Sequence, residues 1–301
     1  MSNHPDRLER IGVGLFTIPG LLDQDFTGTM KRLADIGYKE IEFFGPYPFS
    51  APEAHERWRP IAAALGMKQT GYYGLTALEV KAVLDENGLT SPSMHTDLLT
   101  LRQRIPQLAE AAHVLGQRYV ILPSIPEEER STLDDYRRFA DEFNQIGERA
   151  VAEGIRFAYH NHGYGLSAME GEVPLKLILE RTDPALVDMQ LDIYWNTAGG
   201  GDPLAYLRDY PGRFRLMHIK DMTQRLPVPD DMNNPQAWMA LFQHISDAGH
   251  GVLDLQALIG QGLQSGVQHF LLERDLAPNP QETLQKSYAH LAGLRFDSAV
   301  Q

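Results

Sequence analysis

The sequence contains no cysteine, and its basic residues are outnumbered by acidic ones. The lack of cysteine excludes disulfides and thiolate metal sites, which fits a reducing compartment. With 27 Lys and Arg against 40 Asp and Glu, the net charge is −13. That balance argues against a surface that binds nucleic acid or anionic membranes, although the sequence is compatible with a local basic pocket. Since no apolar run could span a bilayer and no signal-peptide core is present, we expect a cytoplasmic protein.

Short apolar runs alternate with stretches of helical periodicity along the chain. We predict eight strands, at residues 11–16, 39–44, 89–95, 119–122, 157–162, 187–193, 214–219 and 269–272. Helical spacing and end signals predict helices at residues 26–36, 53–65, 75–86, 98–115, 134–152, 173–180, 202–207, 238–246, 253–263 and 281–294. The later strands are apolar on both sides, as strands of a covered parallel sheet are.

Eight β/α units in 301 residues predict a (β/α)8 TIM barrel. A doubly wound open sheet is the alternative. The barrel is favoured because polar residues stand at the C-terminal ends of many different strands, where barrel enzymes build their sites. We expect one domain over residues 1–301, with an insert at about residues 46–74 that serves as a lid or an interface element.

Four consecutive predicted strands each end in a side chain that can bind a metal ion. These side chains are His160, Asp192, His218 and Glu273. Alone, each has an ordinary structural reading, such as a hydrogen-bonded histidine or a helix-capping aspartate. Their occurrence at equivalent points of successive strands instead predicts one shared site. Nitrogen and oxygen ligands of this kind suit Mn²⁺, Mg²⁺, Co²⁺ or Zn²⁺.

Several short motifs resemble the sugar phosphate isomerase/epimerase family of xylose-isomerase-like barrels. They are Gly37-Tyr38-Lys39-Glu40-Ile41-Glu42, Tyr159-His160-Asn161-His162, Leu191-Asp192-Ile193-Tyr194-Trp195, Met217-His218-Ile219-Lys220-Asp221, Gly249-His250-Gly251-Val252-Leu253-Asp254 and Leu272-Glu273-Arg274-Asp275. The resemblance implies a TIM barrel holding one divalent ion, Mn²⁺ before the others, on His160, Asp192, His218 and Glu273. The strand-five position is often Glu in the epimerases, so His160 is a departure that puts symmetrical two-base epimerisation in doubt.

A mechanism follows from these residues. A metal ion would polarise a sugar carbonyl, and Glu273 would remove a proton from the neighbouring carbon. His160, His162 or Lys220 would return a proton. Residues at other strand ends and on nearby loops are candidates for contacts with the sugar. They are Glu42, His95, His162, Trp195 and His250.

We therefore expect a metal-dependent isomerase or epimerase of a sugar or keto-sugar. The second reading is a lyase of the same superfamily, either an inosose-type dehydratase or a deglycosidase that eliminates from a 3-keto sugar. His160 in place of Glu favours this reading. A non-catalytic sugar-binding barrel is the third. An endonuclease role is disfavoured by the acidic surface. A small-molecule substrate is the expected partner, and a homo-oligomer is compatible with the sequence.

Overall fold

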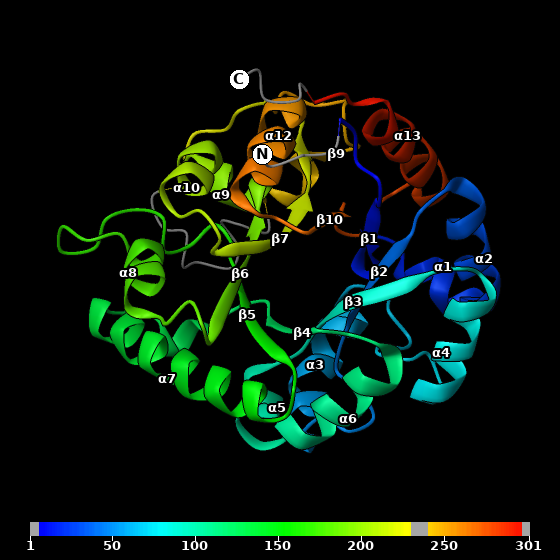
Figure 1. The fold of residues 1–301 in the computed structure, drawn as a ribbon, viewed down its shortest axis with the longest axis horizontal. Coiled ribbons are helices and arrows are strands. Elements are labelled where there is room, and N and C mark those ends of the chain that lie inside the picture. Colours follow the sequence, from blue (N-terminus) through cyan, green and yellow to red (C-terminus); the bar gives the residue numbers. More distant parts are fainter. Residues whose placement is uncertain (1–5, 230–239, 297–301) are drawn as a thin grey trace.

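The computed structural model, which describes residues 6–229 and 240–296, is a closed barrel of parallel strands surrounded by helices (Figure 1). The strands follow one another around the barrel in the order β1-β10-β7-β6-β5-β4-β3-β2. Their bounds are Gly12–Gly14 (β1), Glu40–Phe44 (β2), Thr90–His95 (β3), Tyr119–Leu122 (β4), Arg156–His160 (β5), Val187–Asp192 (β6), Phe214–Ile219 (β7) and His269–Leu272 (β10). This arrangement confirms the predicted TIM barrel.

Helices cover the outside of the barrel. They are α1 (Pro19–Gln24), α2 (Phe26–Ile36), α3 (Pro52–Ala64), α4 (Ala77–Glu86), α5 (Leu98–Gln103), α6 (Ile105–Leu115), α7 (Leu133–Ala152), α8 (Pro174–Arg181), α9 (Ile193–Ala198), α10 (Pro203–Asp209), α12 (Leu255–Ser265) and α13 (Pro280–Gly293), with short 3-10 turns at Leu15–Thr17, Glu127–Glu129 and Phe242–His244. Thr76 and Thr132 begin α4 and α7 with capping boxes. None of the described helices is long and apolar enough to cross a membrane.

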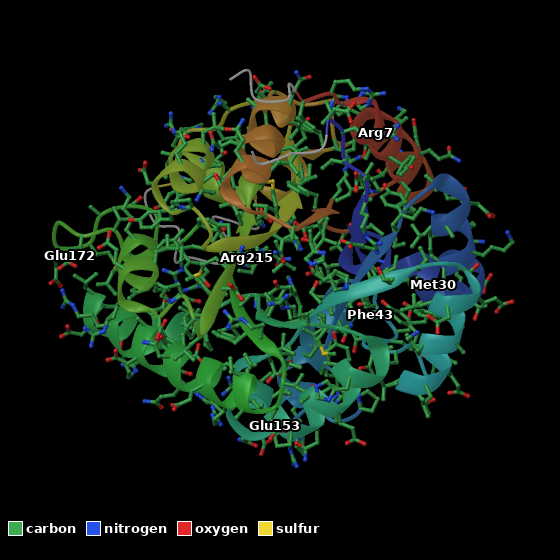
Figure 2. All side chains as sticks on the ribbon, in the orientation of Figure 1. Arg7, Met30, Phe43, Glu153, Glu172 and Arg215 are labelled. Atoms are coloured by element: carbon green, nitrogen blue, oxygen red, sulfur yellow. The ribbon has the colours of Figure 1, made fainter. Side chains whose placement is uncertain are left out.

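The apolar side chains form two layers. The larger core lies between the sheet and its helices, where Met30 and Phe43 are buried while Glu153 and Glu172 point outward (Figure 2). A smaller cluster lies apart from it and consists of Tyr119, Ile121, Ala158, Leu216 and Leu271. These five residues come from β4, β5, β7 and β10, and together they form an apolar floor inside the barrel.

Strand periodicity places the site above this floor. Residues two apart on a strand face the same side. His160, His218 and Glu273 each follow a floor residue by two positions, namely Ala158, Leu216 and Leu271. Asp192 belongs to the same layer, because the register of β6 against β7 pairs it with His218. The strand-end residues therefore form one inward layer at the C-terminal mouth.

The strand predicted at residues 157–162 ends at His160, the strand predicted at 11–16 ends at Gly14, and α1 and α9 were not predicted. Two predicted helices differ further from the structure. The helix predicted at residues 98–115 is broken at Arg104 into α5 and α6, because Pro106 lacks an N–H and its ring excludes the preceding turn of a continuous helix. The helix predicted at 238–246 begins outside the described residues. Its described part holds the turn Phe242–His244 and the strand β9 (Ile245–Ser246), which pairs antiparallel with β8 (Asp221–Met222). That pairing satisfies backbone groups that the sequence pattern assigned to a helix.

Candidate active site

The strand ends bring three potential ligands together. One ligand atom each from Asp192, His218 and Glu273 lies within 4.8 Å of the others, and all three residues are buried. His218 Nδ1 lies 2.8 Å from Glu273 Oε2 and 3.9 Å from Asp192 Oδ2. His160 adjoins this trio, with its Nε2 3.7 Å from Asp192 Oδ2. The four predicted ligands are thus neighbours.

Two of these ligand atoms meet charged groups of the cluster without forming a hydrogen bond of regular geometry. Asp192 ends β6 and caps α9, where its Oδ1 accepts from Trp195 N at 2.8 Å. Among the described residues, its buried Oδ2 and His218 Nδ1 have no hydrogen-bond partner of regular geometry, although Lys220 Nζ lies 3.0 Å from the first and Glu273 Oε2 lies 2.8 Å from the second. A buried polar atom without a partner is costly unless something else satisfies it. A divalent cation fits this donor set of carboxylate oxygen and imidazole nitrogen.

Lys220 enters the same cluster from the end of β7. Its Nζ lies 3.0 Å from Asp192 Oδ2, 2.8 Å from Glu273 Oε2 and 2.9 Å from Asp275 Oδ2. Burial alone would lower the pKa of Lys220, but Asp192 and Asp275 outweigh it and hold that pKa well above its ordinary value. Lys220 is therefore an ammonium at neutral pH.

His218 carries the second positive charge. Burial alone would lower its pKa, but Glu273 and Glu42 raise the pKa of His218 to about 10. Burial likewise opposes the ionisation of Glu273, yet His218 and Lys220 hold the pKa of Glu273 well below its ordinary value. The carboxylate of Glu273 is thus charged and paired on two sides.

The buried charges of the cluster do not balance. Four carboxyl groups face one ammonium and one imidazolium, namely Glu42, Asp192, Glu273 and Asp275 against Lys220 and His218. If all ionise, two negative charges remain in surplus. Burial raises the pKa of Asp192, and it raises that of Asp275 to about 6. Both shifts have the direction expected where carboxylates crowd, and a divalent cation would neutralise the surplus.

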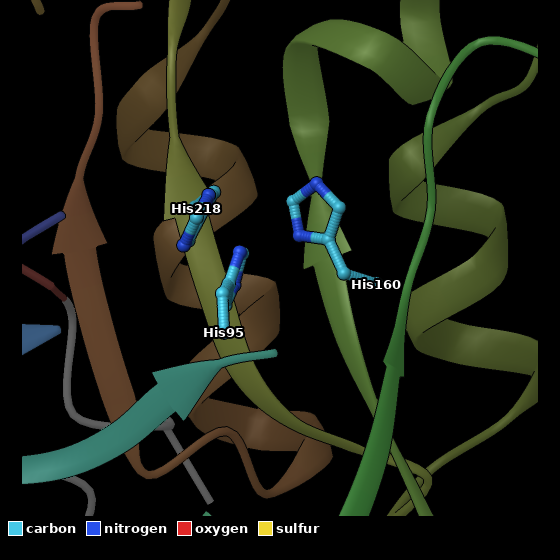
Figure 3. A group of neighbouring side chains, drawn as sticks. All are labelled: His95, His160 and His218. Atoms are coloured by element: carbon cyan, nitrogen blue, oxygen red, sulfur yellow. The ribbon is translucent and has the colours of Figure 1, made fainter. Parts of the chain in front are cut away.

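Three imidazole rings form a layer beside the cluster. Figure 3 shows His95, His160 and His218 converging from β3, β5 and β7. The side-chain amide of Gln190 lies among them: its Oε1 is 2.7 Å from His95 Nε2 and 2.9 Å from His160 Nδ1. Gln190 Nε2 donates to Glu42 Oε2 at 2.8 Å, and Glu42 Oε1 makes a short contact with His218 Nε2. The structure thus brings the predicted Glu42 and His95 into the site.

Sequence reasoning missed two members of this assembly, Gln190 and Asp275. Gln190 stands two positions before Asp192 on the same strand face, and Asp275 stands two positions after Glu273. The period-two spacing that located the predicted ligands was therefore also the signal for both residues.

His162 and Trp195 lie together at the edge of the cluster. Their rings are 5.6 Å apart, the His162 ring is 5.0 Å from that of His160, and Lys220 Nζ is 5.8 Å from the Trp195 ring. His162 Nδ1 donates to Pro123 O at 2.7 Å. Burial and the Lys220 charge lower the pKa of His162 to about 3. His162 is therefore a neutral imidazole at neutral pH.

His250 is placed differently. It is exposed, and no described contact joins its side chain to the cluster. The loop that carries it is anchored by the buried carboxylate of Asp221, which accepts from Gly249 N at 2.9 Å, Gly251 N at 3.0 Å and Leu253 N at 3.1 Å. The Gly-flanked motif around His250 thus holds a loop in place beside β7. A contact between His250 and a sugar stays a prediction.

Comparisons with known proteins agree with this architecture. The model of the family described as xylose isomerase-like TIM barrel matches residues 30–292. Inosose dehydratase from Clostridium tetani is 28% identical over 132 residues, which are 43% of this chain and 43% of that protein. The matched stretch thus spans less than half the length of this curated relative.

Two solved structures share the fold. A sugar phosphate isomerase/epimerase from Parabacteroides distasonis superposes with a TM-score of 0.70 at 22% identity, covering 97% of this chain and 96% of that one. The IOLI protein, whose structure has a zinc atom bound, superposes with a TM-score of 0.65 at 12% identity, covering 94% of this chain and 98% of that one.

Proposed function

The chain belongs to the xylose isomerase-like TIM barrel family, and on that premise we propose that it is a divalent-metal-dependent isomerase or epimerase of a sugar or keto-sugar. The observation that carries the proposal is the crowding of four buried carboxyl groups around one ammonium and one imidazolium at the barrel mouth. There, one ligand atom each from Asp192, His218 and Glu273 lies within 4.8 Å of the others, in a cluster whose carboxyl groups outnumber its cations. Ordinary structural charges would pair completely at such depth.

The residues that would hold the ion are Asp192, His218 and Glu273, with His160 as the fourth. Mn²⁺ is the first choice, and Mg²⁺, Co²⁺ and Zn²⁺ suit the same donors. The zinc atom in the IOLI protein supports a divalent ion in a barrel of this fold. When bound, such an ion supplies Lewis-acid polarisation of a carbonyl group. The remaining chemistry belongs to the side chains of the chain itself.

Glu273 is the proposed base. Its carboxylate is ionised and faces the inside of the barrel mouth, so it can take a proton from the carbon next to the substrate carbonyl. Gly14 of β1 makes room for it: a Cβ on Gly14 would lie 2.9 Å from Glu273 Oε1. The position of the base therefore depends on a glycine from the neighbouring strand.

Lys220 and His162 are the proposed partners of Glu273. The Lys220 ammonium, 2.8 Å from Glu273 Oε2, can donate a hydrogen bond to negative charge that develops on a substrate oxygen, or can return a proton. His162 is neutral and donates from Nδ1 to Pro123 O, so we assign it a hydrogen bond to a substrate hydroxyl in preference to a proton transfer. Trp195 lies 5.6 Å from the His162 ring and is completely buried, so it packs against this part of the site, and a sugar contact for Trp195 stays a prediction.

A lyase is the second candidate. It shares the first step, removal of a proton beside a carbonyl, and then expels a hydroxyl or a glycosidic oxygen from the next carbon. The similarity to inosose dehydratase supports it, as does His160 at the strand-five position. In this reading the Lys220 ammonium would protonate the departing oxygen.

One experiment separates these readings. The Mn²⁺-loaded protein would be incubated with a panel of keto-sugars and inososes in D₂O, and the products analysed by mass spectrometry and ultraviolet absorbance. An isomerase or epimerase incorporates deuterium at carbon without loss of mass, whereas a lyase forms a product that is lighter by water or alcohol and absorbs as a conjugated ketone. Binding of these sugars without either change would favour a non-catalytic barrel and contradict the proposal.

A further inference from the structure

We infer that Gln190 and Glu42 act as positioning residues: Gln190 fixes the proton of His160 on Nδ1, and Glu42 fixes the orientation of the His218 ring, so that His160 Nε2 and His218 Nδ1 face the proposed ion. This inference rests on the proposed metal-dependent function. Neither role follows from the ligand list, because both side chains lie on the far side of the histidine rings from the carboxylate cluster.

The orientation of the Gln190 amide is determined by Glu42. Glu42 Oε2 lies 2.8 Å from Gln190 Nε2 and 2.6 Å from Ser93 Oγ. An ionised carboxylate can only accept hydrogen bonds. A reversed amide would set an oxygen against that carboxylate, so Gln190 must present its N–H group to Glu42 and its oxygen to the histidines.

The amide oxygen then determines the proton positions on two rings. Gln190 Oε1 lies 2.9 Å from His160 Nδ1 and 2.7 Å from His95 Nε2, and an oxygen acceptor requires a donor at each contact. The proton of neutral His160 is therefore on Nδ1. Its Nε2 carries the lone pair and lies 3.7 Å from Asp192 Oδ2.

Glu42 orients the second ring, that of His218. Its Oε1 accepts from His218 Nε2, which leaves Nδ1 as the nitrogen that points to Glu273 and Asp192. One buried layer thus directs two imidazoles, from the strands on either side of β6, toward one point. Hydrogen bonds of this kind behind a metal-binding histidine typically contribute about 10- to 100-fold in metal affinity.

The test compares Gln190→Met with a matched control, Gln117→Met. Both glutamines are buried, and Gln117 Nε2 donates to Ser91 Oγ at 2.7 Å and to Ser93 O at 3.2 Å. Both substitutions therefore replace a buried hydrogen-bonded amide by an apolar chain of similar length. Only Gln190 contacts the histidine rings.

Two readouts are used, and neither is turnover. The first is the ¹⁵N–¹H correlation spectrum of the histidine rings in zinc-free protein, with His160 assigned through His160→Gln. We expect His160 of the wild type to be protonated on Nδ1 only, and Gln190→Met to lose that pattern. The second is Zn²⁺ affinity by competition with a chromophoric chelator. We expect Gln190→Met to bind about 10- to 100-fold more weakly than wild type, and Gln117→Met to bind within about threefold of it.

A wild-type His160 protonated on Nε2 would overturn the inference, and so would equal zinc affinity in the two variants. The wild-type spectrum decides the tautomer even where Gln190→Met does not fold. A wild type that binds no zinc would contradict the proposed metal centre instead, and the spectrum would still report whether Gln190 fixes the His160 proton. The two failures are therefore distinguishable.

Discussion

Lys220 is the residue whose removal most clearly separates a charged metal centre from an ordinary buried ion-pair network. Its ammonium lies within 3.0 Å of Asp192, Glu273 and Asp275, and it is almost completely buried. Lys220→Met keeps the length of the aliphatic chain and removes only the charge. The formal surplus of negative charge in the cluster then rises from two to three.

The burial of Lys220 among carboxylates determines how much unfolding free energy its removal should cost. Removal of one partner from a buried ion pair costs about 3–5 kcal/mol, because the other charge is left uncompensated. We therefore expect metal-free Lys220→Met to lose about 3–5 kcal/mol of unfolding free energy in urea. Mn²⁺ compensates the same carboxylates, so it should raise the stability of Lys220→Met by more than it raises that of wild type.

Lys31→Met is the matched control. Lys31 pairs with Asp35 at 2.8 Å on the surface of α2, where both side chains are about two-thirds exposed. Such pairs contribute less than about 1 kcal/mol, and Mn²⁺ should stabilise this variant as it does wild type. Unchanged stability of metal-free Lys220→Met, or equal stabilisation of all three proteins by Mn²⁺, would refute the reasoning.

Three further predictions concern the base and the ligands. Glu273→Gln should fold normally by circular dichroism yet lose about 10²- to 10⁴-fold in turnover, because an amide cannot take the proton; near-normal turnover would remove Glu273 as the base. The double variant Asp192→Asn, His218→Asn should remain folded but release its ion on dialysis, and full occupancy by elemental analysis would make the ligand set wrong. Gly14→Ala should reduce turnover by displacing the Glu273 carboxylate, whereas Gly20→Ala, whose Cβ meets nothing within 4 Å, should not; equal activity of the two would contradict the close approach of β1.

The architecture could be predicted because it depends on local patterns. Apolar strands alternate with capped helices, and the period of two along each strand places His160, His218 and Glu273 on the inward face. The division between α5 and α6 was signalled locally as well, by Pro106, and it was missed because the helical spacing was extended across that residue.

The contacts across the barrel could not be predicted from such patterns. Glu42 on β2 meets His218 on β7 and Gln190 on β6, although the chain separates Glu42 from each by well over a hundred residues. Which inward side chains meet there depends on barrel closure and strand register. A sugar contact for Glu42 stays a prediction, and its contacts in the structure are to His218, Gln190 and Ser93.

The central claim is that the carboxylate and imidazole cluster holds a divalent ion. Elemental analysis of protein purified without chelator, before and after addition of Mn²⁺ and removal of the excess, tests it directly. The account predicts a single tightly held divalent ion per chain, which Asp192→Asn, His218→Asn loses. A wild-type protein that retains no ion under either condition would leave the barrel in place and contradict the proposed chemistry.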